Sequence, residues 1–379
     1  KLGEIKIPCY AGRLPEEVKN TTELLVLSPG VPVDLPFVEE FKKAGVPVIG
    51  EIELAYLLEK GRVVAITGTN GKTTTTTLVG EIMKAHFADV FVVGNIGNPY
   101  TLEVTKTNEA SVTVAEISSF QLETTDSFHP AVSAILNITP DHLNRHHTME
   151  NYVKAKEAIA AKQTGEEVCV LNYEDAWLRD FAKRCPAKVV YFSSGHRLED
   201  GFYLEGDYIY RAKAGKSEKL LNVHDDMRLV GICNIENVMA ALAIAESMQV
   251  PMETVLRVIK EFKAVEHRIE YVAEKGGVVY YNDAKGTNPD AAIQGIRAMN
   301  RPTVRIGGGY DKGSTYDEWI EAFDKKVKCL VLIGQTRELI AECAKKHGFT
   351  EIRMADTFKE AFDLCVELAE SGDAVLLSP

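Results

Sequence analysis

Short apolar runs alternate with longer segments of helical spacing along most of the chain. Residues 63–67 are apolar or β-branched and predict a buried strand, and the next apolar positions, 78, 79, 82 and 83, have the spacing of a helix. The same alternation returns from about residue 265, with strands expected at 277–282, 302–306, 328–333, 351–354 and 373–377. Alternating strands and helices predict doubly wound sheets, so the expected fold class is α/β.

Breaks in this pattern divide the 379 residues into three expected domains. Residues 1–51 predict a partial N-terminal α/β domain. Within 24–32 we expect a buried strand that ends in a Ser-Pro-Gly turn, followed by a helix near 36–44 and a second short strand at 46–49. Residues 52–264 predict a central nucleotide-binding domain, and 265–379 a second doubly wound, Rossmann-like domain. The chain begins with Lys1 and stops just after a strand-like run, so we expect a longer protein to extend past both ends.

Composition narrows the class of protein. A net charge of −12 disfavours a nucleic-acid or anionic-membrane surface, because phosphate groups need a basic face. No apolar run reaches transmembrane length. The seven cysteines include no Cys-x-x-Cys pair, which favours reduced thiols over disulfides or a zinc knuckle. We therefore expect a cytoplasmic monomer that binds small molecules.

The turn TGTNGKT joins the first strand of the central domain to its helix. Its glycines let backbone N–H groups point at phosphate oxygens, Lys72 supplies a cation, and Thr73 a hydroxyl ligand for Mg²⁺. The common pattern G-x-x-x-x-G-K-[ST] would need glycine at Ile66, so the alternative is a plain strand-to-helix turn. The threonines at 74–77 are poor helix formers and stay unexplained. The predicted nucleoside triphosphate site comprises Gly68, Thr69, Asn70, Gly71, Lys72, Thr73 and Thr74.

Polar residues also follow the neighbouring strands. Glu116 ends a strand expected at 111–117, at the sheet edge where Lys72 lies, and can hold the Mg²⁺ of a triphosphate. His142 follows the strand expected at 131–138 and is a second metal candidate. The pair His142 and His146 leaves zinc open as an alternative, although no third ligand stands at the usual spacing. Ser118 either binds a ligand or caps the helix after it.

Three further segments suggest ligand contacts on weaker grounds. GNIGNP, with Asn95, follows a strand and brings backbone close to a ligand. Asn234 and Asn237 lie one turn apart on an expected helix at 234–248, where their amides suit an adenine edge. A helix cap is the alternative for Asn234 but not for Asn237. Ser28 and Gly30 end the first strand and can face a ligand in the crevice there.

Two loops of the C-terminal domain gather charge at neighbouring strand ends. NDAKGTN contains Asp283, Lys285 and Thr287, and GGGYDKGS contains Lys312. In an acidic protein, lysines concentrated in this way suggest an anionic substrate. Three consecutive glycines at 307–309 resemble a dinucleotide turn, but no G-x-G-x-x-G pattern follows, so a nicotinamide-dependent oxidoreductase is a weak alternative.

These motifs together resemble the Mur ligase superfamily across nearly the whole chain. The resemblance rests on TGTNGKT, GNIGNP, EISSFQLE, NITPDHLNRH, YVKAK, GICNIEN, EHR at 266–268, NDAKGTN and GGGYDKGS. It implies a multi-domain architecture with a central P-loop ATPase domain and ATP-dependent amide formation through an acyl phosphate. NDAKGTN beside LSPGVP is similar to the branch that adds D-glutamate to UDP-N-acetylmuramoyl-L-alanine in cytoplasmic peptidoglycan synthesis.

The resemblance also implies roles for single residues. Lys72, Thr73 and Arg268 would hold ATP phosphates, while Glu116, His142 and a carbamylated Lys156 would hold two Mg²⁺ ions. The remaining implied contacts are Asn234 and Asn237 with adenine; Asp283 with ribose; Ser28, Gly30, Asn95, Ser118 and Gln121 with the muramoyl substrate; and Lys285, Thr287 and Lys312 with D-glutamate. Cys233 stands where the family usually has His.

Two departures from the family pattern affect the expected activity. A first UDP-binding strand and a segment after LLSP, both usual in the family, are missing from the sequence as given, so we expect ATP binding with poor ligation. A folylpolyglutamate synthetase-like ligase is the near alternative. A regulatory P-loop NTPase that hydrolyses nucleotide without an acceptor is the alternative from another functional class.

Overall fold

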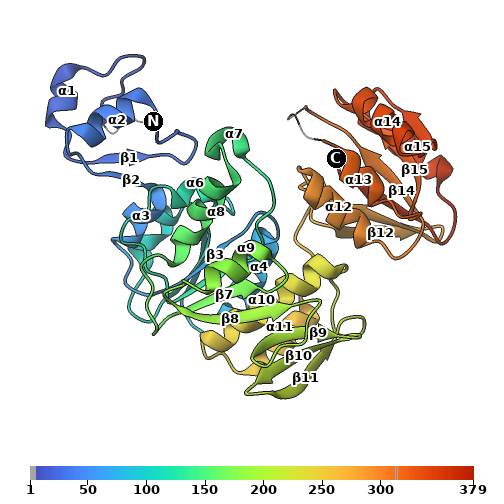
Figure 1. The fold of residues 1–379 in the computed structure, drawn as a ribbon, viewed down its shortest axis with the longest axis horizontal. Coiled ribbons are helices and arrows are strands. Elements are labelled where there is room, and N and C mark those ends of the chain that lie inside the picture. The colour runs from blue at the N-terminus through green and yellow to red at the C-terminus, as the bar shows by residue number, and fades with distance from the viewer. Residues whose placement is uncertain (1–5, 312, 314) are drawn as a thin grey trace.

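A computed structural model describes residues 6–311, 313 and 315–379 (Figure 1). The chain first forms a small unit whose two short strands are parallel. Its elements are α1 (Glu16–Thr21), β1 (Leu25–Leu27), α2 (Pro36–Lys43) and β2 (Val48–Gly50). The expected helix is confirmed, and the first strand ends at Leu27, directly before the Ser-Pro-Gly turn, as predicted.

The central part of the described chain is built on a nine-stranded sheet, in the order β11-β10-β9-β8-β7-β6-β3-β5-β4. Its strands are β3 (Arg62–Thr67), β4 (Val90–Gly94), β5 (Val112–Glu116), β6 (Val132–Ile135), β7 (Val168–Asn172), β8 (Lys188–Ser193), β9 (Gly201–Glu205), β10 (Tyr208–Lys213) and β11 (Lys216–Asn222). The strands from β4 to β9 pair in parallel, and β10 and β11 add an antiparallel edge.

Helices cover both faces of this sheet and give it two hydrophobic cores. Alternate residues of β3 show the division: Val64 and Ile66 pack under α4 and α10, whereas Val63 and Ala65 pack on the opposite face. The helices are α3 (Glu51–Tyr56), α4 (Lys72–Lys84), α5 (Tyr100–Glu103), α6 (Ser119–Leu122), α7 (Leu143–His146), α8 (Met149–Glu157), α9 (Ala176–Ala182), α10 (Ile232–Ser247) and α11 (Met252–Glu261), with 3₁₀ turns at Val104–Lys106 and Ala158–Ala160.

A second sheet forms the C-terminal part, in the order β12-β13-β17-β14-β15-β16. All of its pairs are parallel except the antiparallel edge strand β12. Its elements are β12 (Glu270–Lys275), β13 (Val278–Asn282), α12 (Pro289–Arg297), β14 (Thr303–Gly307), α13 (Asp317–Glu321), β15 (Val327–Leu332), α14 (Arg337–Lys346), β16 (Ile352–Met354), α15 (Phe358–Leu368) and β17 (Ala374–Leu377). The α/β prediction is therefore confirmed.

Strand register places the predicted polar residues at one edge of the central sheet. Ile66 pairs with Glu116, and Thr67 pairs with Ile135, so β3, β5 and β6 all end beside the TGTNGKT turn. The strand expected at 131–138 is shorter than predicted, since β6 stops at Ile135 and the following residues turn toward that loop. Within the described residues, no helix combines the length and apolar character needed to cross a membrane.

Candidate active site

The TGTNGKT turn is held by side chains from the loop after β6 and from α8. Asn137 accepts a hydrogen bond from the Asn70 backbone N–H at 2.8 Å and donates one to the Asn70 carbonyl at 3.1 Å. The Thr69 hydroxyl lies 3.0 Å from the Tyr152 hydroxyl. Gly71 has a φ of +83° and stands directly before Lys72, the first residue of α4. The turn is thus held in shape by polar contacts on both sides.

Two lysines converge on this turn, Lys156 buried and Lys72 half-buried. Lys72 Nζ donates to the carbonyl oxygens of Gly68 at 2.9 Å and Thr69 at 2.8 Å, and Lys156 Nζ donates to the same Gly68 oxygen at 2.8 Å. Burial lowers the pKa of both amines, and the neighbouring Lys72 lowers the pKa of Lys156 further. Lys156 is 1% exposed and lies over the Tyr152 ring, unlike the exposed Lys154 and Lys162.

Glu116 presents a carboxylate oxygen to the same region. Its Oε1 accepts a hydrogen bond from Asn95 Nδ2 at 2.8 Å, while Oε2 is buried and has no hydrogen-bond partner among the described residues. An unpaired buried carboxylate oxygen is costly unless a cation or water satisfies it. Its negative charge acts on Lys72 and raises the pKa of that amine against the effect of burial. The donor set fits Mg²⁺, which prefers carboxylate and hydroxyl oxygens.

The two histidines after β6 have different environments. His142 adopts a left-handed conformation with a φ of +55°, is half exposed, and lies 3.7 Å from Asp141. His146 is buried; its Nε2 lies 2.9 Å from Ser119 Oγ and its Nδ1 3.2 Å from Glu123. A zinc site shared by the two histidines is not supported, because His146 uses both ring nitrogens within the protein and the described residues group neither histidine with other metal-ligating side chains.

Ser118 and Gln121 form the cap of α6. Gln121 N–H donates to Ser118 Oγ, and Gln121 Oε1 accepts from the Ser118 backbone N–H, which is a reciprocal capping box. The capping alternative for Ser118 is therefore confirmed. Any contact with substrate would have to be compatible with this arrangement.

A cavity between the central and C-terminal sheets brings the nucleotide candidates together. Its lining includes Asn70, Gly71, Asn234, Asn237, Arg268 and Asp283. Asn237 Nδ2 donates to Asn234 Oδ1 at 3.2 Å, and Asn234 Nδ2 donates to the Val230 carbonyl at 2.8 Å. The cap alternative for Asn234 is wrong, since α10 begins at Ile232 with Gly231 at its N-cap. Thr75 donates to Asn237 Oδ1 at 3.2 Å, which gives one of the unexplained threonines a role.

Contacts across this cavity join the two large domains. Arg268 Nη2 donates to Thr73 Oγ1 at 3.0 Å, which places the guanidinium at the phosphate turn. Asp290 accepts hydrogen bonds from Asn70 Nδ2 at 2.6 Å and from Thr139 Oγ1 at 3.2 Å. The sequence interpretation missed Asp290 and Asn137, although both lie beside or within motifs it used. Their neighbours carried more obvious chemistry, and only the fold shows that they meet.

Asp283 lines the cavity, but most of its side chain is buried inside the protein. Its oxygens accept hydrogen bonds from Ser378 Oγ at 2.8 Å and from the Ile269 backbone N–H at 3.2 Å. Burial raises the pKa of Asp283 to about 6, and these hydrogen bonds only partly offset that effect. The Asp283 carboxyl group therefore accepts hydrogen bonds within the protein as well as lining the cavity.

The loops of the C-terminal domain surround a second cavity of about 300 Å³. Thr287 lines it, together with Gly309, Tyr310, Tyr316, Trp319 and Pro379. The Lys285 side chain is exposed, and Lys312 lies outside the described residues. Ser28 and Gly30 are exposed in the N-terminal unit, which Figure 1 shows on the other side of the central domain from these loops. The two groups of predicted substrate residues are thus not brought together here.

Comparisons with known proteins match both large domains. The Mur ligase middle domain matches residues 66–245, and the Mur ligase glutamate ligase domain matches residues 267–379. The chain belongs to the Mur ligase family. A UDP-N-acetylmuramoylalanine--D-glutamate ligase of Lachnospira eligens is 57% identical over 379 residues, covering 100% of this chain and 84% of that protein. A Clostridioides difficile ligase of the same name is 49% identical over 369 residues, covering 97% of this chain and 81% of that protein.

Solved Mur ligases share the fold. MurC of Thermotoga maritima superimposes with a TM-score of 0.66 at 20% identity, covering 99% of this chain and 86% of that chain. MurF of Acinetobacter baumannii gives 0.65 at 18% identity, covering 85% and 74%. At this identity the likeness supports the family's multi-domain architecture and says nothing of substrate.

Proposed function

We propose that this protein is an ATP-dependent, ADP-forming ligase that joins D-glutamate to UDP-N-acetylmuramoyl-L-alanine in peptidoglycan precursor synthesis. The observation that carries the proposal is the similarity, at 57% identity over 379 residues and 84% of the relative's length, to a ligase named for this reaction. The site supports it, because a phosphate turn, two lysines, a carboxylate and an arginine from the next domain converge at one sheet edge. We expect the reaction to take place in the cytoplasm, with the protein acting as a monomer.

The chemistry accounts for this concentration of cations. A carboxylate does not react with an amine near neutral pH, because oxide is a very poor leaving group. Transfer of the γ-phosphoryl group of ATP to the substrate carboxylate gives an acyl phosphate, and the amine of D-glutamate then displaces phosphate. Phosphoryl transfer depends mainly on positioning and charge neutralisation. Lys72 and Arg268 would supply both, because both lie at the turn that would hold the phosphates.

Mur ligases use ATP and Mg²⁺, and this chain has residues that fit the metal. Thr73, Glu116 and His142 are the proposed ligands, with the unpaired Glu116 Oε2 as the strongest candidate. When bound, Mg²⁺ would neutralise charge on the phosphates. Glu116 is fixed for this task by the hydrogen bond from Asn95.

We extend the proposal to a carbamylated Lys156 and a second Mg²⁺. The Lys156 amine, whose pKa burial holds well below its usual value, is neutral more readily than an exposed lysine. A neutral amine can attack CO₂, forming an N–C bond and releasing one proton. The resulting carbamate carries anionic oxygens, which suit a hard cation, whereas an ammonium group there would repel it.

The remaining site assignments follow the positions of the side chains. Asn234 and Asn237 line the cavity next to Gly71, where they would face adenine, and Asp283 would approach the ribose. Asn95, Ser118 and Gln121 would contact the muramoyl substrate near Glu116, and Ser28 and Gly30 would contact its nucleotide end. Lys285, Thr287 and Lys312 would receive D-glutamate beside the cavity that Thr287 lines.

The decisive test is phosphate release from ATP with each acceptor substrate alone and with both together. We expect release above background only when UDP-N-acetylmuramoyl-L-alanine and D-glutamate are both present, and Lys72→Met should lower kcat by about 10³-fold or more. Release that requires a folate acceptor instead would support the folylpolyglutamate synthetase-like alternative. Release that needs no acceptor would support the regulatory NTPase alternative and contradict the proposal.

A further inference from the structure

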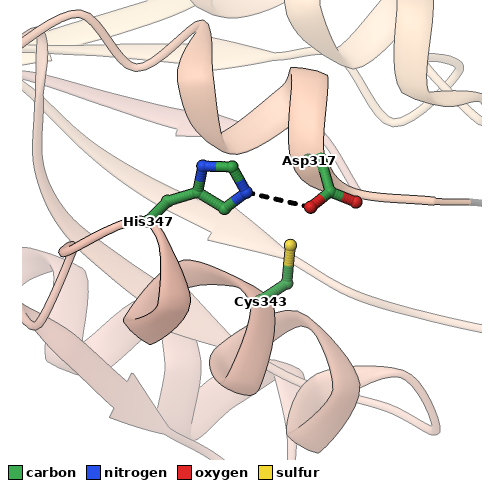
Figure 2. A group of neighbouring side chains, drawn as sticks. All are labelled: Asp317, Cys343 and His347. Atoms are coloured by element: carbon green, nitrogen blue, oxygen red, sulfur yellow. Dashed lines mark hydrogen bonds and ion pairs between the residues drawn. The ribbon is translucent and has the colours of Figure 1, made fainter.

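A cluster of metal-ligating side chains lies away from the nucleotide cavity, between α13 and α14 of the C-terminal domain. Asp317 is the first residue of α13, and Cys343 and His347 lie four residues apart, on α14 and at its C-terminal end. One ligand atom from each residue lies within 4.8 Å of the other two. Figure 2 shows His347 and Cys343 both directed toward the Asp317 carboxylate, with His347 Nε2 2.9 Å from Asp317 Oδ1.

Packing between aromatic side chains brings the two helices that carry these residues together. Trp319 on α13 packs against Phe323, and Phe323 packs against Phe349 just beyond α14. Contacts among these rings hold α13 against the C-terminal end of α14. The spacing of four residues puts Cys343 and His347 on one face of the helix, toward α13. Glu321, four residues after Asp317, lies 3.7 Å from His347 Nδ1, the ring nitrogen that faces away from Asp317, where its carboxylate can orient the imidazole.

We propose that Asp317, Cys343 and His347 form a binding site for Zn²⁺, separate from the Mg²⁺ site proposed for catalysis. Thiolate, imidazole and carboxylate are the donors that Zn²⁺ takes in tetrahedral sites, and water would be the fourth ligand. Mg²⁺ disfavours sulfur and nitrogen donors, so magnesium does not compete effectively here. Binding replaces the thiol proton of Cys343 with the metal and releases that proton to solvent.

The geometry needs only small changes to accept the metal. Ligand atoms around a tetrahedral Zn²⁺ lie closer together than 4.8 Å, while the contact between Asp317 and His347 must open to admit the ion. The side chain of Asp317 is 63% exposed and that of His347 26% exposed, so both can rotate without moving the helices. Tyr316, directly before α13, lines the 300 Å³ cavity, so the metal would fix the start of α13 beside that cavity.

Cobalt(II) is the probe for this site, because a cobalt–thiolate bond gives a charge-transfer absorption band. Titration of the full chain with Co²⁺ in excess Mg²⁺ should give a saturable band at one equivalent, which Zn²⁺ then abolishes by displacement. Cys343→Ser should remove the band, and His347→Ala should weaken Zn²⁺ binding at least tenfold. Co²⁺ should also quench the fluorescence of Trp319, two residues from Asp317.

Control variants separate this site from the nucleotide cavity. Cys233 is the thiol that lines that cavity, and Cys233→Ser should keep the cobalt–thiolate band. The thermal unfolding midpoint of the parent protein should rise with Zn²⁺ concentration, and that of Cys343→Ser should not. Should Cys343→Ser fail to fold, His347→Gln provides the same comparison. Absence of a saturable band, or a band that Cys343→Ser retains, would overturn the proposal.

Discussion

At the scale of single residues, burial decides which charged groups carry chemistry. The YVKAK segment has two lysines, yet only Lys156 turns inward onto the Gly68 carbonyl, while Lys154 stays exposed. Sequence spacing alone cannot separate them, because the direction of α8 relative to the sheet sets which face is buried. The shared Gly68 oxygen brings Lys156 next to Lys72, and this proximity lowers the pKa of Lys156 beyond the effect of burial.

Lys156 yields a prediction about carbon dioxide. If its amine is carbamylated, then removing CO₂ and bicarbonate should slow ligation severalfold, and restoring bicarbonate should recover the rate. Lys156→Arg should be inactive under both conditions, because a guanidinium cannot form the carbamate and is larger than the buried space. Lys154→Arg on the exposed face is the matched control and should behave like the parent enzyme. A rate that ignores bicarbonate would contradict the carbamate.

Asp283 yields a prediction about pH. Its pKa of about 6 in the folded protein exceeds the ordinary value of 3.8, so the folded state favours the protonated carboxyl. The associated stability is complete below about pH 4 and is lost as pH rises through about 6. Asp283→Asn, which cannot ionise, should therefore gain stability relative to the parent as pH rises through that interval, by up to about 3 kcal/mol.

Urea unfolding at several pH values between 4 and 7 measures this difference. Asp225→Asn, at an exposed position, serves as the control for replacing an aspartate. A stability difference between Asp283→Asn and the parent that does not change with pH would show that Asp283 ionises as easily in the folded protein as in the unfolded chain.

At the scale of elements, the strand–turn–helix from β3 to α4 is stabilised by its neighbours more than by local preference. Threonines are poor helix formers, yet Thr74, Thr75 and Thr76 are buried because α4 packs against both the sheet and the neighbouring helix α10. Thr77 Oγ1 donates to the Thr73 carbonyl one turn earlier. Tertiary packing therefore compensates a sequence that would form a weak isolated helix.

A substitution at Gly71 tests how far the conformation of the phosphate turn depends on this packing. Its φ of +83° disfavours any side chain, and a Cβ atom there would lie 2.3 Å from Asn237 Oδ1. Gly71→Ala should cost about 1–3 kcal/mol of stability and weaken ATP binding at least tenfold. Gly165→Ala is the matched control, because an added Cβ meets no atom within 4 Å and the backbone is not in the left-handed region. Calorimetric unfolding and ATP titration of both variants give the comparison.

At the scale of the whole molecule, the active site depends on two domains meeting. Arg268 reaches Thr73, and Asp290 reaches Asn70 and Thr139, so the C-terminal domain contacts the phosphate turn directly. Neither domain contains the complete set of proposed catalytic groups. We expect ATP and the muramoyl substrate to draw the domains closer, as ligands commonly do in enzymes whose sites lie between domains.

Asp290 should contribute measurably to this arrangement. Asp290→Ala removes two hydrogen bonds between the domains, so it should enlarge the radius of gyration without ligand and weaken ATP binding by up to roughly 30-fold, at about 1 kcal/mol per bond. Glu253→Ala removes an exposed acid from the first turn of α11 and is the matched control. Solution scattering and ATP titration check both variants. Identical curves and affinities for Asp290→Ala and the parent would show that these contacts do not hold the domains.

The sequence by itself determined the α/β class, the strands beside the phosphate turn, most strands of the C-terminal domain, the phosphate turn itself and the family resemblance. These features are local, because periodicity and short motifs express the backbone preferences of neighbouring residues. The tertiary structure alone revealed the edge strand β12, the burial of Lys156, the unpaired oxygen of Glu116, and the meeting of Asp290 with Asn70. Each of these depends on residues far apart in the chain, and their meeting follows from sheet order and domain packing, which local pattern does not encode.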